Sequence, residues 1–476
     1  MGSKYKYLGK NVLLFALGGL VPKILSFLLV PYYTGILSTE EYGVADLLLT
    51  TVSILVPIFT LEIQDAVMRF TMDLHYDKKS VLSTSLKIIL VGTSVLVVFL
   101  VAFWYSGFLK IKKSLLFFLT VIFFEIAILN VFSFFCRAID RVRTMTISSI
   151  INALVFLVSN IIFLSVFKMG LNGYLLSYVI GYAALLMYVF FSAKLYKYIC
   201  ISDDKFKKTL NDMLKFCIPL IFGVLAWSIN TALDRYILSW IVGVSASGLF
   251  AISYKIPNLL STFQNIFSQA WSISAIKEFD SDDKDGFMSG MYAMMLFAMS
   301  VTCSVIMAFN VTISKILYSN DFYNAWKYVP PLLFAVVLNA MSLFMGSIYT
   351  AVKDSKSLSI STLLGVLINT IFNFILIYIY GIYGAAIATV IGNFVTFFYR
   401  KVFLRKHINL KINTFREVLV YLALVLEMLF GIWGNKYIIV HLTVIILISI
   451  MHRKEIVKMF DFMKRKIEKV RKSNMG

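Results

Sequence analysis

Apolar runs long enough to cross a bilayer recur along this chain from one end to the other. A helix needs about 20 such residues to span a hydrocarbon core about 30 Å thick. Within lipid, only helices and closed barrels bond all of their own backbone groups. These runs are continuous, whereas barrel strands are segments of about ten residues with alternating polarity. They therefore predict an all-α, polytopic membrane protein with about fourteen transmembrane helices.

The composition agrees with a chain that lies mostly in lipid. Hydrophobic residues make up 60% of the 476 positions and charged residues 15%, against about 25% charged in soluble domains. The first run is too long for the apolar core of a signal peptide, and no small-residue cleavage site follows it. The predicted spans lie near residues 11–37, 44–66, 84–106, 114–136, 145–168, 171–193, 212–234, 237–262, 289–314, 329–352, 357–380, 383–404, 416–434 and 437–451.

The basic residues between the spans predict the orientation. If the N-terminus is cytoplasmic, the cytoplasmic segments hold 35 of the 45 lysines and arginines, as the positive-inside rule requires. One external loop, at Lys110–Lys113, runs against the rule. We expect a multi-pass protein with both termini in the cytoplasm. The net charge is +20, and its basic residues then lie mostly on the cytoplasmic side, where they face anionic membrane lipids. No nucleic acid partner is predicted.

No motif for catalysis or for a cofactor is present. Four scattered cysteines form no CxxC pair, and four histidines have no metal-binding spacing. There is no GxxxxGK[ST] loop for nucleotide hydrolysis. The longest external stretch, near Lys315–Tyr328, is too short to resemble the catalytic loop of membrane-bound sugar polymerases and ligases. We predict that the chain is not an enzyme and uses no cofactor, with coupling to H⁺ or Na⁺ left open.

The chain also matches itself weakly at offsets of 205 and 213 positions. The segment that starts at Arg137 runs parallel to the one that starts at Thr350, and Gln64 pairs with Gln269. An even number of spans in each half makes the repeats parallel. We predict a six-helix lobe at 1–200, a second at 201–410, and two extra helices with a basic tail at 411–476.

Ionisable groups inside the membrane are costly and mark candidate sites. Lys23 follows Pro22 in the first span, Arg235 follows Asp234 at the end of the seventh, and Lys255 lies in the eighth. These three cations are candidates to bind an anionic ligand. The alternative for each is pairing with a carboxylate or reaching toward the interface. Kinks at Pro22 and Pro219, in equivalent spans, point either to a transport site or to packing.

The second span carries Glu62, Gln64 and Asp65. The two carboxylates are candidates for ion coupling, although pairing with Arg69 is the interpretation we favour. Glu125, in the fourth span, is a third coupling candidate and is otherwise a protonated or hydrogen-bonded structural group. Gln64 and Gln269 could line a polar path or join helices. Glu427 lies outside both repeats and is expected to be structural.

Two stretches of this sequence resemble a known family. "NVLLFALGGLVPKILSFLLVPYYTGILSTEEYGVADLL" (Asn11–Leu48), continued by "TLEIQDAVMRF" (Thr60–Phe70), is similar to the opening of Wzx-type polysaccharide flippases. The similarity resumes at "LKFCIPLIFGVLAWSINTALDRYILSWIVGVSASGLFAISYKI" (Leu214–Ile256) and at "FSQAW" (Phe267–Trp271). These flippases belong to the multidrug/oligosaccharidyl-lipid/polysaccharide (MOP) superfamily.

The resemblance implies a fold like that of MATE transporters, with two six-helix lobes in a V and spans one, two, seven and eight lining the cleft. It also implies the bacterial cytoplasmic (inner) membrane and a cargo of undecaprenyl-diphosphate-linked oligosaccharide. A polysaccharide polymerase and glycosyltransferases are the expected protein partners. Our hypothesis is that Lys23, Arg235 and Lys255 hold the diphosphate. The alternatives are a multidrug or cation antiporter of the same superfamily and a non-transporting scaffold for envelope assembly.

Overall fold

The computed structural model describes residues 22–107, 112–200, 206–432, 434 and 438–453, and within these it is helical with no β-strand. It divides into two compact units, Met1–Tyr236 and Ile237–Gly476. The all-α prediction is confirmed. The boundary between the units falls inside a helix, and the predicted division into two lobes and a two-helix appendage stays a prediction.

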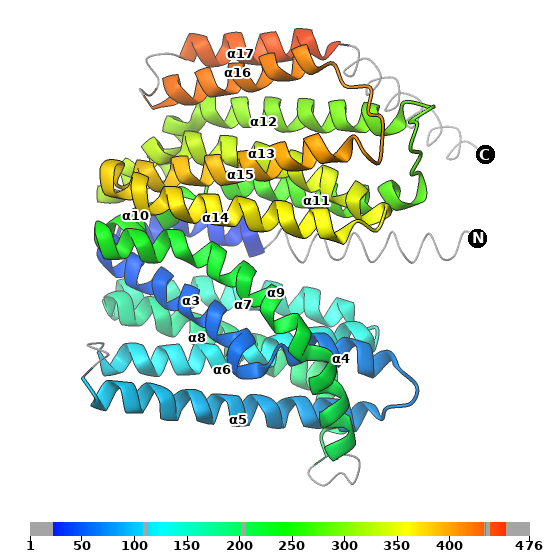
Figure 1. Cartoon of the computed structure of the whole chain (residues 1–476). Coiled ribbons are helices and arrows are strands. Elements are labelled where there is room, and N and C mark those ends of the chain that lie inside the picture. Colours follow the sequence, from blue (N-terminus) through cyan, green and yellow to red (C-terminus); the bar gives the residue numbers. More distant parts are fainter. Residues whose placement is uncertain (1–21, 108–111, 201–205, 433, 435–437, 454–476) are drawn as a thin grey trace, which may run out of the picture. The chain divides into compact units, whose positions relative to one another are not determined.

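The first unit is a set of helices that pack side by side (Figure 1). A π-helical turn at Ile161–Val166 extends α7, and a 3₁₀ turn at Leu195–Tyr198 follows α8. Its helices are α2 (Val30–Thr34), α3 (Thr39–Thr60), α4 (Ile63–Met72), α5 (Lys78–Tyr105), α6 (Lys113–Ala138), α7 (Val142–Asn160), α8 (Gly170–Ser192) and most of α9 (Phe206–Ile241).

The second unit is built in the same way (Figure 1). A 3₁₀ segment at Asn320–Tyr328 leads into α13. Its helices are α10 (Val244–Ser253), α11 (Pro257–Lys277), α12 (Phe287–Leu317), α13 (Val329–Ala351), α14 (Ser355–Tyr380), α15 (Ile382–Leu404), α16 (Thr414–Gly431) and α17 (Ile438–Met451).

Helix starts repeat at the offsets found in the sequence. Helix α3 begins at Thr39 and α10 at Val244, which are 205 positions apart. Helix α7 begins at Val142 and α14 at Ser355, which are 213 positions apart. At these two places the helix starts repeat at the offsets of the sequence match, which is consistent with a duplication.

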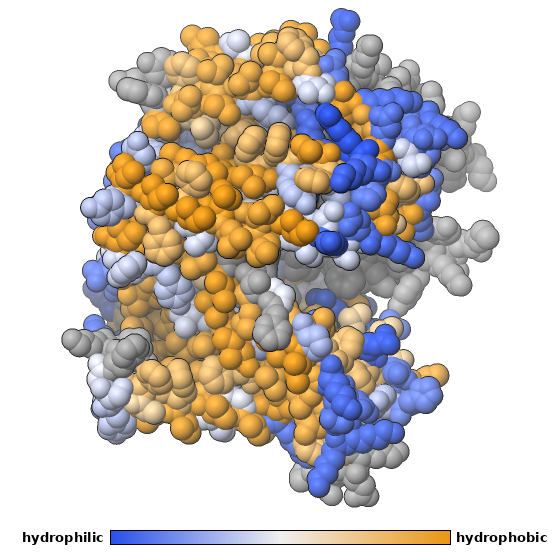
Figure 2. All heavy atoms as spheres, viewed as in Figure 1, coloured by the Kyte–Doolittle hydropathy of each residue, from blue (hydrophilic) through white to orange (hydrophobic). Residues whose placement is uncertain are grey.

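The surfaces of these helices suit a membrane. In the described residues, nine helices are long and apolar enough to span a bilayer. Figure 2 shows that apolar side chains cover the middle of the helices in each unit, while hydrophilic ones gather toward their ends. The chain is thus a multi-pass membrane protein. The count of fourteen spans and the orientation of the termini stay predictions.

Three predicted spans differ from the observed helices. The predicted second span is split after Thr60, and the predicted eighth span is split between α10 and α11. Pro257 opens α11 and has no N–H to donate to the carbonyl four residues earlier, which explains the second break. The seventh span was predicted to end at 234, and this is wrong. Helix α9 runs on to Ile241, where Gly243 turns the chain with a φ of +124°.

Buried carboxylates attach the two C-terminal helices to the second unit. Glu427 of α16 accepts hydrogen bonds from Ser304 of α12 at 2.5 Å and pairs with His441 of α17 at 2.9 Å. Ten residues earlier, Glu417 accepts a hydrogen bond from Tyr292 of α12 at 2.5 Å. All five side chains are buried. These bonds join three helices, in agreement with the structural role expected for Glu427.

Candidate functional site

Helices α3 and α9 are joined by an ion pair inside the first unit. Arg235 Nε lies 2.7 Å from Asp46 Oδ2, and the two side chains are 24% and 19% exposed. One residue along α9, the Tyr236 hydroxyl shares a hydrogen bond of 2.5 Å with the Thr51 hydroxyl. Opposite charges at this distance attract each other, although the two atoms do not meet in hydrogen-bond geometry. The attraction lowers the cost of placing both ionisable groups on apolar helices.

Asp46 is a residue that the sequence reasoning missed. The adjacent Asp234 drew attention as the neighbour of Arg235, whereas the ion pair is made with a residue 189 positions away. Asp46 lies inside the predicted second span, so the cost of an intramembrane charge was a signal that could have identified it. Pairing with a carboxylate, the alternative kept open for Arg235, is what the structure shows.

The break between α3 and α4 forms around Glu62. Leu61 and Glu62 both adopt left-handed backbone conformations, with φ of +54° and +52°, which cost about 1–2 kcal/mol for each non-glycine residue. Glu62 is 4% exposed. Its backbone oxygen accepts a hydrogen bond from the Cys217 thiol of α9 at 3.3 Å. The chain thus turns at a buried carboxyl group, where a continuous span was predicted.

One oxygen of that carboxyl group is occupied and the other is not. The Gln64 side-chain amide donates to Glu62 Oε1. Within the described part of the chain, Glu62 Oε2 is buried with no hydrogen-bond partner. A buried, unpaired carboxylate is costly, so this position favours either a bound proton or a cation. Glu62 and Gln64 are therefore brought together, with half-buried Asp65 one position further.

The favoured pairing of Glu62 and Asp65 with Arg69 is wrong. Arg69 is exposed, and its guanidinium lies 6.0 Å from the centre of the Phe216 ring. Among the described residues, no ion pair links Arg69 to either carboxylate. Helix α4 turns the arginine toward α9 instead. Because Arg69 does not neutralise them, the two carboxyl groups remain candidates for ion coupling.

Glu125 is buried near the middle of α6, as the sequence predicted. It is 7% exposed, and its Oε2 atom has no hydrogen-bond partner in the described residues. A protonated carboxyl group suits a buried position of this kind, and among the described residues no hydrogen bond joins Glu125 to Glu62.

The two remaining cations have different surroundings. Lys23 is exposed on the first described helical turn, where its carbonyl accepts a bond from the Ser26 hydroxyl. Lys255 is half-buried in the short break between α10 and α11. In the described residues no carboxylate lies within ion-pair distance of Lys255. Gln269 is exposed on α11, five residues beyond buried Gln264.

The predicted candidates therefore separate by unit. The first unit contains Lys23, the Glu62 cluster, Glu125 and the Asp46–Arg235 pair, while the second contains Lys255 and Gln269. In the described residues, no group of three or more His, Cys, Asp or Glu side chains is placed to hold a metal ion. At these sites, apolar helices are interrupted or joined at charged side chains. This feature is typical of transporters.

Comparison with solved structures identifies the fold. An inward-facing multidrug resistance MATE family transporter of the MOP superfamily matches with a TM-score of 0.62 at 14% identity, over 82% of this chain and 97% of that chain. Lipid II flippase MurJ in an inward closed conformation matches with a TM-score of 0.65 at 16% identity, over 93% and 100%. A MOP superfamily transporter from Pyrococcus furiosus matches with a TM-score of 0.57 at 15% identity, over 83% of this chain and 94% of that chain. The chain thus has the fold of these transporters.

A family model gives the more specific assignment. Residues 8–272 match the model of the polysaccharide biosynthesis protein family, which is more than half of the chain. The chain belongs to this family. No curated protein sequence matches it. The predicted resemblance to Wzx-type flippases of the MOP superfamily is confirmed at the level of family and fold.

Proposed function

We propose that this protein moves undecaprenyl-diphosphate-linked oligosaccharide units across the bacterial cytoplasmic membrane for the synthesis of surface polysaccharide. The observation that carries the proposal is the family match over residues 8–272. The fold is shared with a protein described as a lipid II flippase, which supports a lipid-linked cargo. Family and fold neighbours are transporters, so catalysis by this chain is not proposed.

The chemistry of such a cargo explains why a protein is needed. Each sugar hydroxyl moved into hydrocarbon without a partner costs a few kcal/mol, and the diphosphate is charged as well. An oligosaccharide carries many hydroxyls, so unassisted transfer is negligible. A polar path through the protein replaces the lost hydrogen bonds, while the prenyl chain stays in the bilayer.

Lys255 is the residue that we propose to bind the diphosphate. It lies half-buried where α10 gives way to α11, so its ammonium group is placed at a break in an apolar helix without a carboxylate partner among the described residues. A lysine binds phosphate as a compact point charge. Lys23 is the equivalent candidate in the first unit. Arg235 is better suited to positioning α9, because Asp46 already holds it.

Glu62 is the residue that we propose to couple transport to an ion. Its buried carboxyl group has one oxygen free of hydrogen bonds in the described residues, and it occupies the break between α3 and α4. Asp65 and the Cys217 thiol are the other titratable groups close to it. Binding or release of a proton or Na⁺ there changes the charge at a point where the helix already bends.

Replacement of Lys255 in a strain that lacks the chromosomal gene tests the binding role. A hydrogen bond to a charged group contributes about 1.5–3 kcal/mol, so Lys255→Ala should lower surface polysaccharide synthesis about tenfold or more. Lys255→Arg, which keeps the charge, should retain most of it. Lys315→Ala, which removes an exposed lysine of the same unit, is the matched control.

Each variant is also checked for its level in the membrane, and undecaprenyl-linked oligosaccharide is measured in whole cells. The proposal predicts that this lipid accumulates when Lys255→Ala is the only copy. Full polysaccharide synthesis by a normally inserted Lys255→Ala variant contradicts the role of Lys255. Normal synthesis in the absence of the gene contradicts the function itself.

A further inference from the structure

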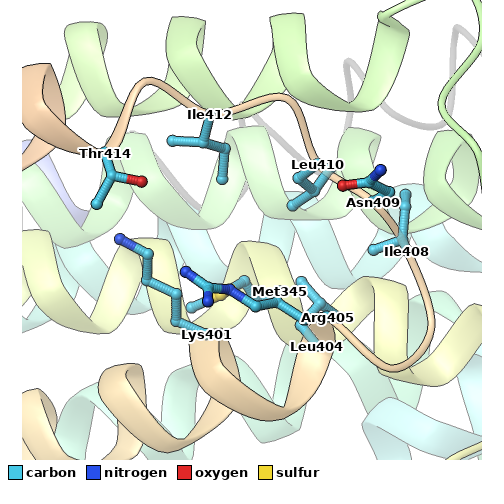
Figure 3. Close-up of a pocket in the computed structure, with 9 residues that line it drawn as sticks. All are labelled: Met345, Lys401, Leu404, Arg405, Ile408, Asn409, Leu410, Ile412 and Thr414. Carbon is cyan, nitrogen blue, oxygen red and sulfur yellow. The ribbon is translucent and has the colours of Figure 1, made fainter.

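A pocket in the second unit lies apart from the residues proposed to act in transport. It has a volume of about 320 Å³ and opens between the last turn of α15 and the segment 405–413 that leads to α16 (Figure 3). This size is at the lower end of the range for small-molecule sites. Its lining residues are Met345, Lys401, Leu404, Arg405, Ile408, Asn409, Leu410, Ile412 and Thr414.

Two basic side chains enter this pocket from one face of α15. Lys401 and Arg405 are four residues apart, so their side chains lie one above the other on the helix. Figure 3 shows both charged groups directed toward the end of the pocket where Thr414 begins α16, with the Thr414 hydroxyl turned inward. Two cations are thus directed to the same place.

The nearby negative charge balances one of these cations. Lys401 Nζ lies 2.6 Å from Glu417 Oε2, and the Glu417 carboxylate is buried. The other oxygen of Glu417 accepts the Tyr292 hydroxyl, so this carboxylate is fully used. In the part of the chain that the structure describes, no carboxylate pairs with Arg405. The pocket therefore keeps an excess of positive charge.

The segment that covers the pocket is held in place. Asn409 N–H donates to the Ser281 carbonyl at 3.0 Å, and Lys411 N–H donates to the Ser289 hydroxyl at 2.7 Å. The Lys411 ammonium group donates to the Asp283 carbonyl at 3.3 Å. A wall fixed at several points needs little reorganisation when a ligand enters, which favours binding.

We propose that this pocket binds a phosphate group. The guanidinium of Arg405 presents a planar fork of donors that matches phosphate oxygens. The Lys401 ammonium group, whose charge Glu417 balances, has further N–H groups to donate. The Thr414 hydroxyl offers a further polar contact at the same end of the pocket. Apolar side chains such as Leu404 and Ile412 line the rest of the pocket, so the ligand carries an organic part beside its phosphate.

Two sources supply this chemistry, an anionic phospholipid head group and a soluble phosphate compound. The pocket lies on the predicted cytoplasmic side, where anionic lipids concentrate and basic pockets bind their head groups. This site is separate from the proposed transport residues, and its test does not depend on the cargo.

Binding to the full-length protein, purified in detergent and freed of lipid, tests the proposal. Native mass spectrometry measures bound phosphatidylglycerol, with phosphatidylcholine as the zwitterionic comparison, and a second titration uses inorganic phosphate. Arg405→Ala is expected to weaken phosphate-group binding about tenfold. The matched control is Lys406→Ala, because Lys406 is an exposed neighbour that lies over the Phe403 ring and does not line the pocket.

The outcomes distinguish the two sources of phosphate from the absence of a site. Tighter binding of phosphatidylglycerol than of phosphatidylcholine, reduced by Arg405→Ala alone, supports the lipid source. Binding of inorganic phosphate without lipid, with the same dependence on Arg405, supports the soluble source. Absence of both, or equal binding by Arg405→Ala and the unaltered protein, overturns the proposal. Arg405→Gln provides the same comparison if the alanine variant does not insert.

Discussion

The ion pair between Asp46 and Arg235 is expected to stabilise the first unit measurably. Coulomb's law with an effective dielectric constant of about 20 gives roughly 6 kcal/mol of attraction at 2.7 Å. Removing two partly buried charges from water offsets most of this attraction. With about a fifth of each side chain exposed, we expect Asp46→Ala to lower the free energy of unfolding by about 1–3 kcal/mol.

A double-mutant cycle separates the pair from its surroundings. The variants are Asp46→Ala, Arg235→Ala and the double variant, with Arg69→Ala as a control because Arg69 is exposed and has no carboxylate partner among the described residues. Unfolding is followed in detergent by heat or denaturant. Removing both charges is expected to cost less than the sum of the single losses, by about 1–2 kcal/mol.

The same variants distinguish positioning from cargo binding. If Arg235 positions α9 against α3, the double variant recovers part of the transport that Asp46→Ala loses. Additive losses of stability, with a coupling energy below about 0.5 kcal/mol, would refute the ion pair as the role of Arg235. Loss of transport in the stable double variant would return Arg235 to the group of cargo-binding residues.

Three further predictions concern the second unit. Glu427→Ala leaves two buried donors unpaired, at about 1–3 kcal/mol each, so the temperature of unfolding in detergent should fall clearly; an unchanged temperature contradicts the network. A methyl group at Gly365 would lie 1.9 Å from the Thr396 hydroxyl, so Gly365→Ala should cost about 1–3 kcal/mol, whereas Gly290→Ala meets nothing within 4 Å and should not. Hydrogen bonds from Ser357, and then the contact with His407, lower the pKa of Asp354 from 3.8 to about 2. Its stabilising effect is therefore present above about pH 4 and lost as the pH falls toward 2, and the stability difference between the unaltered protein and Asp354→Asn should shrink over that window.

Most of the helices were predictable because lipid leaves the backbone few choices. A continuous apolar run must be a helix, and the repeat offsets of 205 and 213 reappear in the helix starts. The break at Leu61 and Glu62 was not predictable, because neither residue is glycine or proline. Conversely, Pro219 lies inside the continuous helix α9, so a proline did not mark a break there.

The candidate site was only partly predictable, since charge partners depend on tertiary packing. The cost of charge in the membrane correctly singled out Glu62 and Glu125 as buried groups. It could not show that Arg235 binds Asp46, or that Arg69 turns toward Phe216. The first contact depends on the packing of α3 against α9, and the second on the bend that starts α4. Neither feature can be predicted from the local sequence.

Flipping by the purified protein in vesicles is the direct measurement of the proposed function. The purified protein is placed in vesicles with an undecaprenyl-diphosphate oligosaccharide that carries a fluorescent sugar, and a membrane-impermeant reagent quenches the dye on the outer leaflet. With the unaltered protein, the reagent is expected to reach nearly all of the dye. In empty vesicles and in vesicles with Lys255→Ala, about half of the dye should stay protected during the assay. The assay is repeated with H⁺ and Na⁺ gradients in both directions, after insertion of the protein has been confirmed. If the dye is then equally protected with and without the unaltered protein, the protein does not flip this cargo.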